Sequence, residues 1–329
     1  MTAIAATLQS FFTDRLARHL QASPHTIAAY RDTLRLLLTF LHDRTGVPPS
    51  RLDWADLDAE AIGAFLDHLE TDRHNSARTR NARLTAIRAL FAYAALRHPE
   101  HSVGIARVLA IPAKRFEKAT VSYLNGEEVA ALLAAADRTR WEGRRDYALM
   151  LVAIQTGLRI SELLGLNVDD ITLGTGKHLR CNGKGRKRRA VPLNEPVEEV
   201  LRDWLTERHG NPGEPVFITR TGRRLSPDAV QQRIDVYAAA GAADCPSLQA
   251  RKLSPHTFRH TSAMNLLRAG VDTTVIALWL GHTDVRSTNA YLHADLEIKE
   301  RALARVAPIG TSAGRYQPID QLLDFLEAL

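Results

Sequence analysis

Residues 254–270 read SPHTFRHTSAMNLLRAG, and the first four letters also occur earlier in the chain, around His25. Each copy predicts the start of a helix, because serine is a good N-cap and proline suits the first helical position. The copies differ three residues beyond the histidine, where His256 is followed by Arg259 and His25 by Ala28. Positions three apart share a helix face, so the second copy presents an imidazole and a guanidinium together where backbone N–H groups favour an anion. This pair alone also fits a helix-start histidine near a surface arginine.

Three further stretches in the same half of the chain add charged or nucleophilic side chains. TGLRISEL places Arg159 after a glycine turn among apolar residues, where a charge needs a partner such as Glu162; a purely structural ion pair is the alternative. GKGRKRR places Lys184 between two glycines at a predicted hairpin tip, unless it is only a solvated basic turn. LGHTDVRSTNAYLH presents His282 after a helix end and then Tyr291, which could instead be a half-buried aromatic with an ordinary hydrogen bond.

The first hundred residues show helical apolar stripes separated by short breaks. LQSFFTDRLARHL predicts one helix, the first SPHT begins a second that ends at Gly46, and DAEAIGAFLDHLE predicts a third. Ser76 caps the fourth, ARTRNARLTAIRALFAYAALRH, which brings three arginines together away from the apolar stripe. The candidate DNA contacts on this helix are Arg78, Arg80 and Arg83. The alternative is that they form only a solvated basic face.

The helical apolar stripe is interrupted from Pro112 onward, which predicts a linker there and a second domain beyond it. Helices are expected at 126–136 and 144–156, then a turn and helix in TGLRISELLGL. Two strands, HLRCNG and RRAVPL, follow around the turn GKGRK, and the pattern then returns to helix up to the C-terminus. The predicted fold is mostly α with a small β-hairpin, divided into 1–110 (helical), 111–122 (linker), 123–306 (mixed α/β) and 307–329 (a tether and a final helix).

Length and composition set limits on the class of protein. The 329 residues suffice for two domains, and a formal net charge of +6 fits a polyanionic partner such as nucleic acid. Cys181 and Cys245 form no CxxC motif or Cys/His cluster, so neither a disulfide framework nor a zinc site is favoured. The chain lacks a signal-peptide pattern and a long apolar run, which predicts a soluble, cytoplasmic protein without membrane contact.

Taken together and in order, the motifs resemble the tyrosine recombinase (phage integrase) family, especially its Xer-type and transposon- or integron-associated members. The residues that carry this resemblance are Arg159, Lys184, His256, Arg259, His282 and Tyr291. It implies a two-domain DNA clamp, in which a helical core-binding domain precedes the catalytic domain. It also implies strand cutting and rejoining through a 3′-phosphotyrosyl intermediate, by way of a Holliday junction in a tetrameric synapse.

The same resemblance assigns a role to each catalytic position. Arg159 and Arg259 would clamp the scissile phosphate, with His282 donating a further hydrogen bond and Glu162 in a supporting role. Bidentate, permanently charged arginine suits the negative charge that develops at phosphorus.

The resemblance also implies groups that transfer protons and groups that bind DNA. Tyr291 would be the nucleophile, His256 would assist its deprotonation, and Lys184 would protonate the leaving 5′-oxygen. A phenol with a pKa near 10 needs such help at neutral pH. Further DNA contacts are expected beside the hairpin tip, from Arg186, Lys187 and Arg188.

No cofactor or metal is expected, since the sequence has no GxxxxGK[ST] loop, no HExxH and no carboxylate cluster suited to a metal pair. The expected partners are double-stranded DNA with inverted half-sites and further copies of the chain, with or without partner recombinases. Two other functions are considered, a non-cutting DNA-binding protein of the same fold and a type IB-like topoisomerase. The apolar face of the short amphipathic stretch 317–329 is predicted to dock on a protein surface. The family resemblance implies that this surface belongs to a neighbouring copy, its own domain being the alternative.

Overall fold

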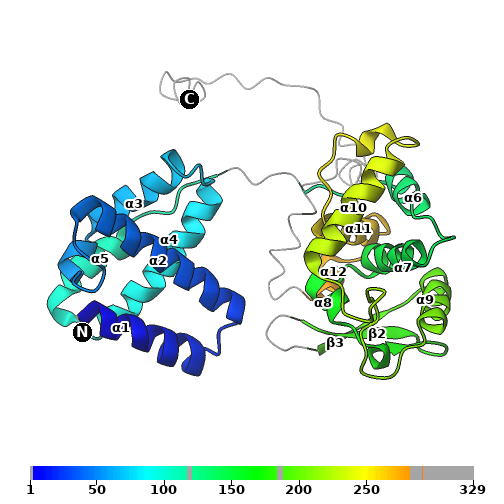
Figure 1. Cartoon of the computed structure of the whole chain (residues 1–329), viewed down its shortest axis with the longest axis horizontal. Coiled ribbons are helices and arrows are strands. Elements are labelled where there is room, and N and C mark those ends of the chain that lie inside the picture. The colour runs from blue at the N-terminus through cyan, green and yellow to red at the C-terminus, as the bar shows by residue number, and fades with distance from the viewer. Residues whose placement is uncertain (1–2, 117–120, 184–187, 282–290, 292–329) are drawn as a thin grey trace, which may run out of the picture. The chain divides into compact units, whose positions relative to one another are not determined.

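The computed structural model (Figure 1) describes residues 3–116, 121–183, 188–281 and Tyr291. The chain forms two compact units, Met1–Lys118 and Ala119–Leu329. Both are mainly helical, and the strands in the described ranges lie in the second unit. The prediction of a mostly α protein with a small antiparallel β element is therefore confirmed. No helix in these ranges is long and apolar enough to cross a membrane.

The first unit is a helical bundle around a mainly aliphatic core that also contains aromatic side chains. Its helices are α1 (Ala3–Ser10), which continues as the π-helix η1 (Phe11–His19), α2 (Pro24–Thr45), α3 (Ala59–Thr71), α4 (Ala77–Ala95) and α5 (Ser102–Ala110), with 3-10 turns η2 (Trp54–Leu57) and η3 (Pro99–His101). Serine caps begin α2 and α4, and Gly46 ends α2 in the left-handed conformation that glycine adopts without cost. The fourth predicted helix ends earlier than expected, at Ala95, and α5 is a separate helix that the sequence did not reveal.

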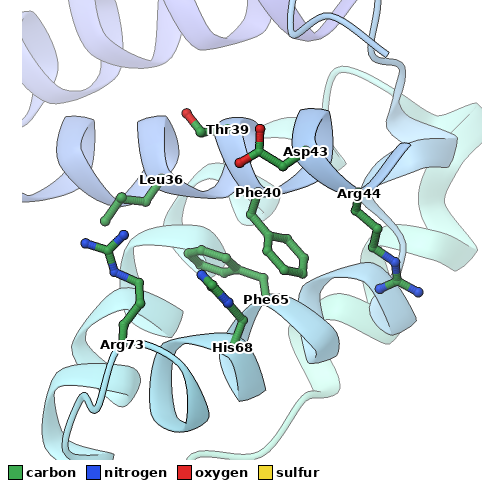
Figure 2. Close-up of a pocket in the computed structure, with 8 residues that line it drawn as sticks. All are labelled: Leu36, Thr39, Phe40, Asp43, Arg44, Phe65, His68 and Arg73. Carbon is green, nitrogen blue, oxygen red and sulfur yellow. The ribbon is translucent and has the colours of Figure 1, made fainter. Parts of the chain in front are cut away.

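A hollow of about 310 Å³ lies between α2 and α3 on this unit (Figure 2). Phe40 of α2 meets Phe65 and His68 of α3 there, with ring centroids 5.6 and 5.1 Å apart. Charged groups of Asp43, Arg44 and Arg73 stand around these rings. The residues described as lining this hollow include none of the predicted site residues.

The second unit combines helices with a three-stranded antiparallel sheet in the order β1-β2-β3. Its elements are α6 (Gly126–Ala134), α7 (Trp141–Thr156), α8 (Ile160–Gly165), η4 (Val168–Asp170), β1 (Ile171–Thr172), β2 (His178–Asn182), β3 (Arg188–Pro192), α9 (Glu195–Arg208), α10 (Pro227–Gly241), η6 (Pro246–Leu248), α11 (Pro255–Arg268) and α12 (Thr273–Leu280). The two predicted strands are β2 and β3, and the two-residue β1 adds an edge that was not expected.

The expectation of helix from the hairpin to the C-terminus is wrong between α9 and α10. Residues 209–226 follow an irregular path with an isolated bridge between Ile218 and Arg224. Prolines and glycines in this stretch (HGNPGEP) break the helical pattern. Phe217 and Ile218 are nevertheless buried in the core, so the segment packs as a fixed part of the unit.

Candidate active site

The helices α7, α11 and α12 come close together at Gly157, beside the candidate site. Gly157 ends α7 at φ +63°, and a Cβ there would lie 2.5 Å from Leu280 Cδ2 and 2.9 Å from Ser262 Oγ. Only glycine therefore lets α7 end against α11 and α12. The chain then turns and Arg159 becomes the N-cap of α8, with its side chain 31% exposed.

A buried carboxylate holds the Arg159 side chain in place. Glu162 Oε1 accepts from Arg159 Nη1 at 2.9 Å, and its other oxygen accepts from the Arg159 backbone N–H at 2.9 Å. Arg189 adds two donors, at 3.0 and 2.8 Å. Burial alone would raise the pKa of the Glu162 carboxyl, but these arginine hydrogen bonds outweigh it and hold the pKa below its ordinary value. The ion pair expected from TGLRISEL thus forms, with a second arginine that the sequence reasoning missed.

Strand alternation explains why Arg189 and Arg188 differ. Arg188 is exposed at the start of β3, whereas the Arg189 side chain is 14% exposed and turns toward Glu162. Successive residues of a strand point to opposite faces, so only one of the two can enter the site. This alternation was readable in RRAVPL, but the partner on α8 was not.

Three arginines converge on the C-terminal end of α12, where unpaired carbonyls carry the negative end of the helix dipole. The bonds are Arg189 Nε to Trp279 O at 3.0 Å, Arg259 Nη2 to Leu280 O at 2.7 Å and Arg159 Nη2 to Gly281 O at 3.3 Å. Gly281 suits this position because its φ is +64°, a left-handed conformation that glycine adopts without cost, and a Cβ there would also lie 2.7 Å from Arg189 Nη1. The sequence predicted a helix end at this glycine. The structure shows in addition that arginines bind the carbonyls at this end.

Arg259 is the most deeply placed of these cations. Its residue is 1% exposed, and Nη1 donates to Gly157 O at 2.7 Å in addition to the bond on α12. Burial, and then the nearby charge of Arg159, lower its pKa to about 10, so it is still a cation at neutral pH. Two guanidiniums held close together by fixed acceptors form an anion site suited to a phosphate.

Tyr291 lies in an apolar pocket beside this cation pair. The residue is 3% exposed and packs with Ala263 and Met264 of α11 and Ile276 of α12. Burial raises the pKa of the phenol, while the positive charges of Arg259 and Arg159 act in the opposite direction. The structure therefore brings together four of the predicted catalytic residues around one spot: Arg159, Glu162, Arg259 and Tyr291.

One histidine of α11 adjoins the phenol, and a second packs against the first. His260 Nδ1 lies 3.1 Å from Tyr291 Oη, and the His256 ring meets the His260 ring edge to face at 4.3 Å between centroids. Sequence reasoning singled out His256 and passed over His260. The signal was present, because residues four apart on a helix share a face.

The predicted DNA-contact arginines of α4 divide into two groups. Arg78 is exposed and Arg83 half-buried; burial, and then the charge of Arg73, lower the pKa of Arg83. Arg83 lines a groove of about 680 Å³ between α2 and α4, together with His25, Thr26, Ala29, Tyr30, Asp32, Thr33, Thr79, Ala82, Thr85 and Ala86.

The expectation that Arg80 faces away from the apolar stripe is wrong. The residue is 6% exposed, pairs with Glu70 at 3.5 Å and donates to Pro112 O at 3.3 Å. Its spacing to Leu84 and Ile87 places it in line with the buried stripe. Arg80 therefore ties α4 to α3 and to the segment after α5.

Several predicted positions lie outside the described residues. These are Lys184, Arg186, Lys187, His282 and the tail 307–329. Among the residues that are described, no group of three or more His, Cys, Asp or Glu side chains could hold a metal ion.

Comparison with known proteins gives consistent matches. Residues 122–297 match the family model "Phage integrase family", and residues 10–98 match "Phage integrase, N-terminal SAM-like domain". The chain is 51% identical over 326 residues to the "Putative integrase/recombinase y4rC" of Sinorhizobium fredii, covering 99% of this chain and 98% of that protein. It is 32% identical over 291 residues to a "Tyrosine recombinase XerC" of Pseudomonas fluorescens, covering 87% and 91%. The fold is similar to that of the XerH site-specific recombinase bound to palindromic difH substrate, with TM-score 0.67, 24% identity, and 88% and 82% coverage.

Proposed function

Because the chain belongs to the phage integrase family and is a tyrosine-type site-specific recombinase, we propose that it cuts and rejoins double-stranded DNA through a 3′-phosphotyrosyl link to Tyr291. The observation that carries this proposal is the position of the Tyr291 phenol, buried within electrostatic reach of both Arg259 and Arg159. A nucleophile beside two guanidiniums can attack the phosphate that those guanidiniums bind.

The arginine pair supplies the electrostatic part of catalysis. Attack on a phosphodiester gives a five-coordinate phosphorus whose non-bridging oxygens carry extra negative charge. Within the described residues, Arg159 and Arg259 each use two of their five N–H donors on fixed acceptors, so both are oriented before DNA arrives. Preorganised donors of this kind are each worth about 10²–10³ in rate. His282 adds a further donor in this proposal.

Proton transfers accompany the two bond changes. The phenol of Tyr291 loses its proton with the assistance of His256 as its oxygen bonds to phosphorus. The 5′-oxygen leaves with a proton from Lys184. Religation runs the same steps in reverse, and the phosphotyrosyl bond conserves the energy of the broken phosphodiester. The proposed reaction therefore needs neither a nucleotide nor a metal, and we expect it to persist in EDTA.

The first unit and the hairpin grip the duplex in this proposal. Arg83 offers positive charge at the α2–α4 groove and Arg78 is exposed at the start of α4. Arg188 is exposed on β3 and is preceded along the chain by Lys187 and Arg186. Contacts of this kind bind phosphates and make affinity fall steeply with salt. Arg80 is left out of this surface because its charge is already paired with Glu70.

Recombination of two duplexes requires four active sites, one for each strand cut. We propose a tetramer on two pairs of inverted half-sites that passes through a Holliday junction. Residues 317–329 dock on the neighbouring copy in this proposal. Deleting them should leave binding to one half-site unchanged but prevent synapsis and strand exchange, and normal recombination by the truncated chain would contradict the docking.

The test of the proposed function is a nicked suicide DNA substrate followed by denaturing electrophoresis. Wild-type protein should form a covalent protein–DNA complex, and Tyr291→Phe should form none while binding DNA normally. If the chain were a non-cutting DNA-binding protein, neither the wild type nor Tyr291→Phe would form a covalent complex. A type IB-like topoisomerase predicts relaxation of supercoiled DNA without recombinant products.

A further inference from the structure

His260 is the imidazole that the structure brings against the phenol of Tyr291. The Nδ1 and Oη atoms are 3.1 Å apart, and the two rings meet at 65° with centroids 5.5 Å apart. This is a hydrogen-bonding distance between a nitrogen that can accept and a hydroxyl that can donate. His260 was not among the predicted catalytic residues, and the proposed function gives it no role.

We propose that His260 is the group that takes the proton from Tyr291 during strand cleavage and returns it during religation. The inference rests on the proposed function, because it requires Tyr291 to be the nucleophile. His256 then acts through His260, against which its ring packs edge to face at 4.3 Å between centroids.

The backbone around His260 is fixed by its buried neighbours. Arg259 on one side bonds the carbonyls of Gly157 and Leu280. Thr261 on the other side is fully buried, and its Oγ1 accepts from Leu124 N at 2.9 Å and donates to Thr257 O at 2.9 Å. A side chain between two such anchors is held in a narrow range of directions. His260 itself is partly buried.

The pocket around the phenol creates the need for a proton acceptor. Tyr291 is 3% exposed among apolar side chains of α11 and α12. Burial raises the pKa of its phenol, which makes the phenolate rare at neutral pH. A general base in contact with the hydroxyl removes this obstacle as the new bond forms.

During cleavage His260 gains one proton and Lys184 loses one. In the neutral tautomer that carries its proton on Nε2, His260 Nδ1 accepts the hydrogen bond of the Tyr291 hydroxyl. The O–H bond breaks, the proton moves to Nδ1, and an oxygen lone pair forms the O–P bond. The P–O5′ bond breaks, and the leaving oxygen takes a proton from Lys184. His260 ends as an imidazolium beside a phosphotyrosine, and religation reverses each change.

The test compares single-turnover cleavage of a nicked DNA substrate by the full-length wild type and His260→Asn at saturating DNA. Asparagine can hydrogen-bond the phenol but cannot take its proton. We expect the cleavage rate to fall by about 10²–10³-fold, within the range typical of general acid–base catalysis, at unchanged DNA affinity. The residual rate should climb with pH as the phenolate fraction rises. His209→Asn is the matched control, because His209 is exposed at the end of α9 with φ +51°, a conformation that asparagine tolerates.

A second substrate separates this role from protonation of the leaving group. A 5′-bridging phosphorothiolate leaves as a thiolate and needs no proton. It should therefore restore cleavage by Lys184→Ala but not by His260→Asn. Cleavage by His260→Asn near the wild-type rate, or rescue of His260→Asn by the sulfur substrate, would overturn the assignment. Absence of a covalent complex with wild-type protein, or its presence with Tyr291→Phe, would instead overturn the proposed function and this inference with it.

Discussion

The helices α2 and α11 begin with the same four residues, Ser-Pro-His-Thr, but in different surroundings. At α2 the Ser23 hydroxyl accepts from Thr26 N at 3.2 Å, and both residues are exposed. At α11 Thr257 is buried, and its hydroxyl accepts from Ser254 N at 3.1 Å. The local sequence thus sets a helix start in both places, while the packing around it decides which polar groups are shielded from water.

The difference grows along each helix. Three residues past the histidine, α2 has Ala28, whereas α11 has the buried Arg259 bound to two carbonyls. One turn past His256, His260 meets the phenol of Tyr291. The lesson is that a shared start motif predicts secondary structure, and that chemistry follows from the charged groups that other helices bring to it.

The largest expected effect comes from Arg259→Lys. Lysine keeps the charge but loses the planar fork, which bonds Gly157 O and Leu280 O and, in the proposed function, also binds the phosphate. We expect single-turnover cleavage to fall by about 10²–10³-fold. Arg83→Lys in the first unit should change DNA affinity slightly and leave the rate at saturating DNA unchanged. Equal rates for wild type and Arg259→Lys would remove the main distinction between the two helix starts.

A large loss of stability is expected from Glu162→Gln. Removing one partner of a buried ion pair typically costs about 3–5 kcal/mol, and here two arginines lose their carboxylate. Asp32→Asn near the start of α2 is the matched control, since its pair with Arg31 is exposed and such pairs are worth about 0–1 kcal/mol. Urea unfolding at neutral pH measures both, and a similar small change in the two variants would show that the ion pairs near α11 are not specially stabilising.

The same carboxylate predicts a pH dependence. The folded pKa of Glu162 is lowered, so its contribution to stability is present above the unfolded pKa of about 4.3 and is lost as pH falls through the folded value. The free energy of unfolding of the wild type should therefore fall in acid more steeply than that of Glu162→Gln. Parallel curves for the two proteins would contradict the assigned role of this group.

The smallest expected effect separates the two threonines of the start motif. Thr257→Val removes the acceptor for Ser254 N at a buried position and should cost about 1–3 kcal/mol. Thr26→Val, on an exposed helix start, leaves the Ser23 cap in place and should cost well under that amount. Urea titrations of the two variants compare them directly, and an equal cost would mean that burial does not distinguish the copies.

The sequence predicted the helix starts and the hairpin because caps and glycines are local signals. The catalytic roles came from the family resemblance and stay predictions. The sequence could not supply partners from distant elements. Arg80 was expected to be exposed, but Glu70 on α3 and Pro112 O offered it a buried pair. Arg189 was overlooked because its carboxylate, Glu162, belongs to another element.

His260 illustrates the same limit within the site. Its spacing from His256 was visible in the sequence, but its proposed role depends on contact with Tyr291, which lies 31 residues further along the chain. The break after α9 was missed although its prolines and glycines were visible in the sequence, and the burial of Phe217 there depends on the packed core of the second unit.

One paired measurement decides whether only the second of the two helix starts carries chemistry. Single-turnover cleavage of a nicked DNA substrate is followed at saturating DNA for His25→Ala and His256→Ala. We expect His256→Ala to slow cleavage by about 10²-fold or more, whereas His25→Ala should cleave at the wild-type rate with at most weaker, salt-sensitive binding. Comparable loss of cleavage rate in both variants, or none in either, would contradict this expectation.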